Sequence, residues 1–181
     1  AQKRPVIVFM GRLTLHKGVQ YFIQLAKQVV ARIPDALFVV AGSGDMYHEL
    51  LLTSAEQALS ASVVFSGFVR STQRDKLLDR ADVFVMPSIS EPFGLVAVEA
   101  AQRHTPVIIS KNAGVSEVMK GAIALDFWDV EKMVDSIENL VKNSEYSQQV
   151  VSNQFNDMQH ITWNNAATKV KKSYMKALLG K

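Results

Sequence analysis

The sequence contains no cysteine, carries little net charge and has no long apolar run, and each of these absences excludes a class of protein. Without cysteine, the chain can form neither a disulfide framework nor a thiolate metal site. No apolar run approaches the roughly 20 residues that a helix needs to span a bilayer, and no signal-peptide pattern opens the chain. The formal net charge of +3 is too small to indicate strong non-specific binding to nucleic acid. We therefore expect a cytoplasmic protein with no transmembrane segment and no nucleic-acid partner.

Metal and cofactor chemistry also find little support in the sequence. The histidines are scattered without the paired spacing of a metal site; they are His16, His48, His104 and His160. Lysines recur through the last apolar-periodic segment, where a solvated helix face is the favoured interpretation; they are Lys169, Lys171, Lys172 and Lys176. We expect no bound metal and no resident cofactor.

What is present fits one globular domain. The 181 residues are 48% hydrophobic and 20% charged, which is enough apolar material to bury a core. The chain begins with Ala1 rather than methionine and enters an apolar run after four residues, so we expect a piece of a longer protein.

Short apolar runs alternate with segments of helical spacing. The runs predict buried strands over 5–10, 37–41, 63–65, 83–86, 107–109 and 122–125. The helical spacing predicts helices over 19–32, 47–59, 130–141, 145–158 and 166–179, a short one that contains Leu77 and Leu78, and one that begins near Phe93 or Gly94. This alternation predicts an α/β fold: a Rossmann-like, doubly wound parallel sheet of about six strands, with helices on both faces and a helical tail over 129–181.

Four loops that follow predicted strands carry unusual chemistry. They span residues 11–18, 42–45, 66–69 and 87–94. Ligands of an open parallel sheet bind beyond the carboxyl ends of the strands, so we expect all four loops to border one crevice.

The stretch from Met86 to Glu99 organises this expected site. A buried strand stops at a proline, a polar loop projects Glu91, and a helix then begins whose unpaired N–H groups and positive dipole end favour an anion. Glu91 and Glu99 flank this helix start with seven residues between them. Arg12 and Lys17 supply fixed positive charge, and together with the glycines and the helix start they suit a diphosphate. Glu91 would then accept hydrogen bonds from sugar hydroxyls, and Glu99 from a ribose diol.

Each of these residues also has a plainer interpretation. Arg12 and Lys17 could be solvated loop charges, Glu91 a helix cap, Glu99 an exposed helix residue and Phe93 a core side chain. A nicotinamide fingerprint at Gly42-Ser43-Gly44 is disfavoured, because Tyr47 stands at the third glycine position and the motif follows the second strand.

Five segments, in this order, resemble those of a known family: GRLTLHKG, VVAGSG, VVFSGFV, ADVFVMPSISEPFGLVAVEA and TPVIISKNAGVSEV. The chain resembles the C-terminal, donor-binding half of retaining glycosyltransferases of family 4, also described as glycosyl transferases group 1, which have the GT-B fold. The resemblance covers about residues 5–125 and makes the whole of 1–181 a nucleotide-sugar binding domain. It implies an acceptor domain, N-terminal in the enzyme, that is absent from this chain.

The resemblance implies a role for each site residue. Arg12 and Lys17 would hold the donor diphosphate and stabilise the leaving group, while Glu91 contacts the transferred sugar. The remaining donor-binding positions are Gly11, Gly42, Ser43, Gly44, Gly67, Val69, Phe93, Gly94, Leu95, Val96 and Glu99. Among these, the loops at 42–44 and 67–69 would hold the nucleobase, and Glu99 would bind the ribose. The backbone of Phe93 and Gly94 would contact the sugar, and the N–H groups of Leu95 and Val96 would bind the phosphates.

The implied enzyme is a metal-independent hexosyltransferase that retains the anomeric configuration. Its donor would be a nucleotide-diphosphate sugar, and its acceptor a glycan, lipid or small molecule bound mainly by the missing domain. The isolated chain would bind nucleotide weakly and transfer sugar very poorly.

Two positions depart from the family pattern. His104 stands where the family usually has glycine before the fifth strand, so we expect the preceding helix to end with a different turn geometry. Ala113-Gly114 replaces a common glycine pair, which could reshape the pocket near the sugar.

Other function classes remain open. A non-catalytic nucleotide-sugar-binding module would keep the fold but should lose Arg12, Lys17 or Glu91, all of which are present. Another GT-B enzyme, such as a phosphorylase or a sugar-nucleotide epimerase, is a second alternative; a glycogen-type phosphorylase needs a lysine bound to pyridoxal phosphate, and no motif singles one out. A purely structural interaction domain would have no reason to gather these charges in four loops.

Overall fold

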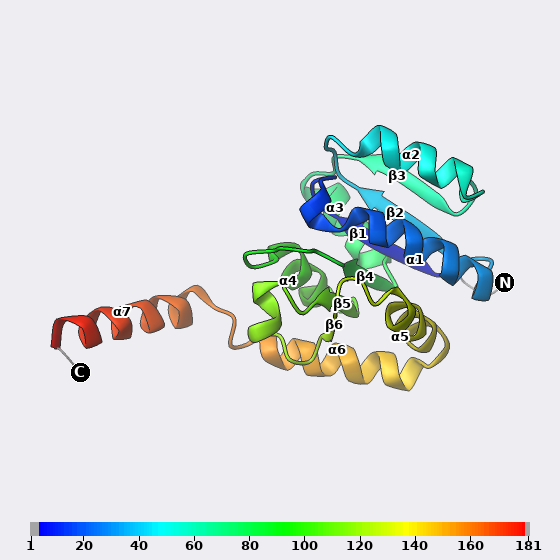
Figure 1. Cartoon of the computed structure of the whole chain (residues 1–181). Helices are drawn as coiled ribbons and strands as arrows, with labels where there is room; N and C mark the ends of the chain where they lie inside the picture. The colour runs from blue at the N-terminus through cyan, green and yellow to red at the C-terminus, as the bar shows by residue number, and fades with distance from the viewer. Residues whose placement is uncertain (1–3, 180–181) are drawn as a thin grey trace.

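A six-stranded parallel sheet forms the centre of the computed structural model, which describes residues 4–179 (Figure 1). The strands lie in the order β3-β2-β1-β4-β5-β6. Their bounds are β1 Val6–Met10, β2 Leu37–Ala41, β3 Val63–Gly67, β4 Val83–Met86, β5 Val107–Ser110 and β6 Ile123–Leu125. The predicted doubly wound sheet of about six strands is confirmed. Residues 1–3 and 180–181 of the predicted 1–181 domain lie outside the described residues.

Helices cover both faces of the sheet and continue into a C-terminal tail. They are α1 Val19–Arg32, α2 Tyr47–Glu56, α3 Ser71–Arg80, α4 Leu95–Gln102, α5 Val130–Lys142, α6 Ser144–Met158 and α7 Trp163–Leu179. Short 3-10 turns add Leu15–Lys17 and Gly114–Glu117. The expected helix near Phe93 or Gly94 begins one residue later, at Leu95, because Gly94 takes a left-handed conformation. The predicted helix 47–59 ends earlier, at Glu56, and the predicted 166–179 starts earlier, at Trp163.

Two hydrophobic cores lie on opposite faces of the sheet, because successive side chains of a strand point to opposite faces. Ile7 and Phe9 belong to the core under α1, α2 and α5, whereas Val8 belongs to the core under α3 and α4. Helix α6 contributes to both, with Val150 in the first core and Met158 in the second. Burial on both faces explains why β1, β2 and β4 read as unbroken apolar runs, whereas the edge strand β3 alternates between buried and more exposed residues.

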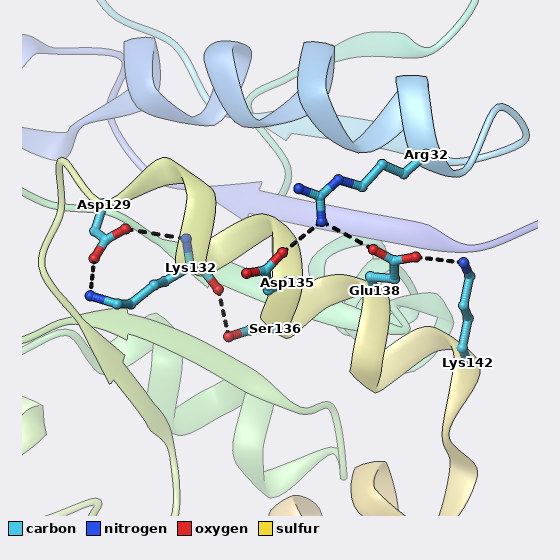
Figure 2. Close-up of polar contacts among 7 residues, drawn as sticks. All are labelled: Arg32, Asp129, Lys132, Asp135, Ser136, Glu138 and Lys142. Atoms are coloured by element: carbon cyan, nitrogen blue, oxygen red, sulfur yellow. Dashed lines mark hydrogen bonds and ion pairs between the residues drawn. The ribbon is translucent and has the colours of Figure 1, made fainter.

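Ion pairs join α1 to α5 at the protein surface (Figure 2). Arg32 Nη1 donates to Asp135 Oδ1 at 2.6 Å and to Glu138 Oε2 at 3.2 Å. Lys142 Nζ also donates to Glu138, at 2.6 Å, and the pKa of Glu138 is lowered by these hydrogen bonds, the one from Lys142 first. Asp129 caps the start of α5. Its pKa is lowered chiefly by the hydrogen bond from the Lys132 side chain, at 2.6 Å.

The last helix stands apart from the cores. In Figure 1, α7 extends away from the rest of the molecule, and none of its side chains is buried. Trp163 at its start is 88% exposed. Among residues 4–179, no helix is both long enough and apolar enough to cross a membrane.

The turn between α4 and β5 keeps the geometry of a glycine turn although it contains His104. His104 has a φ of 58°, in the left-handed region, and the N–H of Thr105 donates to the Ala100 carbonyl at 3.1 Å. The N–H of His104 donates to the Ala101 carbonyl, also at 3.1 Å, which completes a Schellman motif. The expected change of turn geometry does not occur. The imidazole stacks on Phe155 of α6 with 5.1 Å between ring centroids, a contact that glycine could not make.

Candidate functional site

The candidate site lies where the strand order reverses, between β1 and β4. In doubly wound sheets this switch point opens a crevice beyond the carboxyl ends of the two strands. A cleft of about 360 Å³ occupies it here. From the loop after β1, Gly11, Arg12 and Lys17 line this cleft. From the loop after β4 and the start of α4, it is lined by Ser88, Glu91 and residues 93–96. Most of the predicted site residues therefore share one cleft.

The loops after β1 and β4 are fixed to each other through their backbones. The His16 carbonyl accepts the N–H groups of Ile89, at 2.9 Å, and of Ser90, at 3.2 Å. Gly18 has a φ of 69°, and a Cβ built there would lie 1.8 Å from the Pro87 carbonyl oxygen. Only glycine allows this approach, so this residue sets the spacing of the two loops.

Lys17 and Glu91 form a direct ion pair across the cleft. Lys17 Nζ lies 2.5 Å from Glu91 Oε2, and the two side chains are only 18% and 13% exposed. The sequence predicted that both residues would reach one site, but not that they would bind each other. Because both are largely shielded from water, their attraction is less screened than that of a surface pair.

Arg12 differs from Lys17 in that its side chain has no side-chain or backbone partner among the described residues. Its side chain is exposed at the cleft and makes no hydrogen bond or ion pair within residues 4–179. Helix α4 begins beside it without a capping side chain, after Gly94 at a φ of 106°. An unpaired guanidinium next to uncapped N–H groups can bind an anion that enters the cleft.

Ser88 is a cleft residue that sequence reasoning missed. Its side chain is fully buried, and its Oγ finds no hydrogen-bond partner among the described residues. A serine in a strand-to-helix loop is too common to single out, and its unsatisfied hydroxyl is visible only in three dimensions.

The glycine-rich loop after β2 packs against the loop after β1 rather than lining the cleft. A Cβ at Gly42 would lie 1.8 Å from the Gly11 carbonyl oxygen, and one at Gly44 would lie 2.3 Å from the Leu13 carbonyl oxygen. The N–H of Leu13 donates to the Ser43 carbonyl at 2.9 Å. These glycines are needed for loop packing, in addition to any role toward a ligand.

The loop after β3 completes the same edge of the sheet. The N–H of Gly42 donates to the Gly67 carbonyl at 2.8 Å, so this loop adjoins the previous one. Gly67 and Val69 lie outside the cleft lining, and a Cβ at Gly67 would meet nothing within 4 Å. Beside them, Phe68 is exposed, with the Arg70 guanidinium 5.3 Å from the centre of its ring.

Glu99 also lies outside the cleft lining, on α4. Its Oε1 accepts a hydrogen bond from Arg74 Nη1 of α3 at 2.9 Å. Sequence reasoning did not single out Arg74, because the two residues are 25 positions apart on different helices.

Ala113 and Gly114 pack against the loop that contains Glu91. The N–H of Gly114 donates to the Glu91 carbonyl at 3.0 Å, and a Cβ at Gly114 would lie 2.2 Å from the Pro92 carbonyl oxygen. Ala113 is buried at an ordinary φ of −84°, so alanine fits there without strain. Among residues 4–179, no group of three or more histidines and carboxylates is placed to hold a metal ion.

Comparison with known proteins gives a consistent result. A family model described as glycosyl transferases group 1 matches residues 1–157. An uncharacterized glycosyltransferase of Methanocaldococcus jannaschii is 35% identical over 178 residues, which are 96% of this chain and 45% of that protein. An alpha-D-kanosaminyltransferase of Streptomyces kanamyceticus is 26% identical over 83% of this chain and 40% of its own length. The chain thus spans less than half of these relatives.

Solved structures share the fold. The Anabaena protein HepE, solved in complex with UDP and glucose, superposes with a TM-score of 0.82 at 20% identity over 94% of this chain and 48% of that one. The C-terminal domain of a group 1 glycosyl transferase from Francisella tularensis superposes with a TM-score of 0.77 at 23% identity, over 89% of this chain and 93% of that one. At these identities the likeness establishes the fold alone.

Proposed function

The chain belongs to the glycosyl transferases group 1 family, and from that premise we propose that it is the donor-binding half of a retaining, family 4 GT-B enzyme. The enzyme would transfer a hexose from a nucleotide-diphosphate sugar to an acceptor hydroxyl. The observation that carries the proposal is the shared cleft at the switch point, in which Arg12, the Lys17–Glu91 pair and the start of α4 meet.

In this proposal the two cations serve the leaving diphosphate. The bond between the anomeric carbon and the diphosphate oxygen breaks, and charge accumulates on the phosphates. Arg12 offers unpaired N–H donors, Lys17 adds a second charge, and the N–H groups of Leu95 and Val96 at the start of α4 bind phosphate oxygens. The acceptor oxygen bonds to the anomeric carbon, and its proton passes to the departing phosphate.

Glu91 would bind the transferred sugar. Its carboxylate is held in place by Lys17 and its backbone by the Gly114 N–H, so its orientation is fixed before the sugar arrives. A carboxylate held in this way accepts hydrogen bonds from sugar hydroxyls without a large ordering cost. Phe93 and Gly94 would add backbone contacts at the same place.

The nucleoside would extend from the cleft along the loops after β2 and β3. Backbone hydrogen bonds join these two loops to each other and to the loop after β1. The base would bind to backbone groups of Gly11, Gly42–Gly44 and Gly67–Val69. Glu99 would accept hydrogen bonds from the ribose hydroxyls. The UDP present in the HepE structure supports a nucleotide ligand for this fold. Metal independence, the absence of a resident cofactor and a cytoplasmic location are parts of the same proposal.

The acceptor would be a glycan, lipid or small molecule bound mainly by an N-terminal domain. The chain's share of its relatives, 45% and 40% of their lengths, is compatible with this part of the proposal. We expect the isolated chain to bind nucleotide weakly and to transfer sugar very poorly. Arg12, Lys17 and Glu91 in one cleft favour this enzyme over a non-catalytic binding module, which would not need to keep all three.

Calorimetric titration with UDP, ADP, GDP and their glucose conjugates tests the proposal. We expect one nucleotide to bind with a millimolar to micromolar dissociation constant, and Arg12→Gln to weaken it by about tenfold through loss of a charge-assisted contact. Lys27→Gln is the matched control, because Lys27 is an exposed cation on α1 away from the cleft. No binding by the wild-type chain to any of these ligands at millimolar concentration would contradict the proposal.

A further inference from the structure

The Glu99 carboxylate is held by an arginine of the neighbouring helix. Arg74 Nη1 donates to Glu99 Oε1 at 2.9 Å, and the two side chains are 36% and 33% exposed. The second oxygen, Oε2, accepts no hydrogen bond from the described residues. One oxygen is thus anchored, and the other is available to a ligand.

Arg74 is itself fixed by further ion pairs. Its Nε and Nη2 both donate to Asp75 Oδ1, at 3.1 and 3.0 Å. The other oxygen of Asp75 pairs with Arg103 at 2.9 Å, and Arg103 also donates to Asp79 at 2.7 Å. The guanidinium therefore has most of its donors engaged, and its plane is set before any ligand binds.

The fold brings these residues together because α3 and α4 pack on the same face of the sheet. Leu78 of α3 and Ala97, Ala100 and Ala101 of α4 share one buried core. Above this core, Arg74 and Glu99 lie within hydrogen-bonding distance of each other on the partly exposed side. Helix α3 starts directly after the loop 66–70 that adjoins the predicted nucleobase site.

We propose that Arg74 is a positioning residue, which orients Glu99 so that its unengaged oxygen accepts hydrogen bonds from the vicinal diol of the donor's ribose. This inference rests on the proposed function, since it assigns the residue that prepares Glu99 for the nucleoside. A glutamate without such a partner samples several rotamers and must be ordered when the ribose arrives.

A plainer role is also consistent with the contacts: Arg74 could simply tie α3 to α4 at the surface. The structure offers a control that separates the two roles. Arg103 joins the same two helices through ion pairs with Asp75 and Asp79. It attracts Glu99 only through space and, within residues 4–179, makes no hydrogen bond to it. Loss of Arg103 should therefore weaken the helix pair as much as loss of Arg74, without releasing Glu99.

The test compares how strongly each variant prefers a ribose diol. The probes are the best binder among UDP, ADP and GDP, and its 2′,3′-dideoxy form, titrated by calorimetry. For the wild-type chain we expect the diol form to bind about tenfold more tightly, as for the loss of a good polar contact. Arg74→Gln should reduce this preference by about 3- to 10-fold and leave the dideoxy affinity unchanged. Arg74→Lys should restore part of it, and Arg103→Gln should leave the preference as in the wild type.

Each other outcome has a defined meaning. If Arg74→Gln weakens both ligands equally, or if Arg103→Gln lowers the diol preference as much, Arg74 acts as a helix tie and the inference is overturned. If the wild-type chain binds nucleotide without any diol preference, the inference also fails while the proposed function stands. If the wild-type chain binds no nucleotide, the proposed function fails and the inference with it. Arg74→Lys keeps the charge and so provides a reading if Arg74→Gln does not fold.

Discussion

Removing the charge of Lys17 or Glu91 should destabilise the folded chain even without a ligand. Their charged atoms lie 2.5 Å apart, and the side chains are 18% and 13% exposed. At an effective dielectric constant of about 20, such charges attract by roughly 6–7 kcal/mol, but desolvation and lost side-chain entropy offset most of this. An exposed pair contributes up to about 1 kcal/mol, and breaking a fully buried one costs about 3–5 kcal/mol. We expect a coupling of about 1–3 kcal/mol for this pair, between these limits.

Urea unfolding of Lys17→Met, Glu91→Gln and the double variant measures this coupling as a double-mutant cycle. The matched control is the same cycle on Lys111 and Asp126, whose charged atoms are 2.9 Å apart but whose side chains are 56% and 32% exposed. That pair should couple by less than about 1 kcal/mol. Equal coupling energies for the two pairs would contradict this expectation, because the difference in burial would then have no energetic consequence.

Three further changes test the local geometry. Gly18→Ala should lower the free energy of unfolding by more than about 2 kcal/mol in urea titrations, because its Cβ would meet the Pro87 carbonyl. Gly67 is the control, since it has the same φ of 69° but nothing within 4 Å of a built Cβ. Gly67→Ala should lower the free energy of unfolding by only about 1 kcal/mol. His104→Ala should cost about 1 kcal/mol through lost ring stacking, whereas His104→Gly should stay near wild type, because relief of the left-handed strain compensates; equal losses in the two variants would contradict this. The folded-state pKa of Asp129 is lowered, so its contribution to stability is present above its unfolded pKa of about 3.9 and is lost as pH falls through the lower folded value. Asp129→Asn should therefore flatten the acid limb of a stability–pH profile, and an unchanged limb would count against that contribution.

The strands and their parallel arrangement could be predicted from the sequence because burial on both faces leaves a clear pattern. Runs such as Val83–Met86 contain no polar residue, and the helical segments between them force crossover connections. The position of the four loops at one edge followed from topology alone, since the carboxyl ends of parallel strands lie together, but only the loops after β1 and β4 line the cleft. The structure places Arg12, Lys17 and Glu91 in one cleft, and their roles toward a ligand stay a prediction.

The direct contacts within the site could not be predicted in the same way. Lys17 and Glu91 are 74 positions apart, so their hydrogen bond depends on the approach of two loops that Gly18 permits. Arg74 reaches Glu99 only because α3 and α4 share a face of the sheet. The glycines at 42 and 44 looked like ligand-facing positions, yet their nearest neighbours are carbonyl groups of the loop after β1. Such packing between loops leaves no periodic trace in a sequence.

Helix ends were predicted less well than helices. Helix α4 starts after Gly94 and ends before His104, and both residues have a positive φ. Histidine is uncommon in this left-handed conformation, so the sequence did not indicate it. Helix α7 was expected from its spacing of apolar residues, but this spacing could not show that none of its side chains is buried in the chain.

The central claim is that a nucleotide diphosphate binds in the cleft between β1 and β4. It is tested most directly by following the backbone amide signals of the isotope-labelled chain during titration with UDP, ADP or GDP. We expect saturable shifts at residues 11–18 and 87–96, which are reduced in Arg12→Gln and unchanged in Lys27→Gln. Shifts confined to other parts of the chain, or none at millimolar nucleotide, would contradict it.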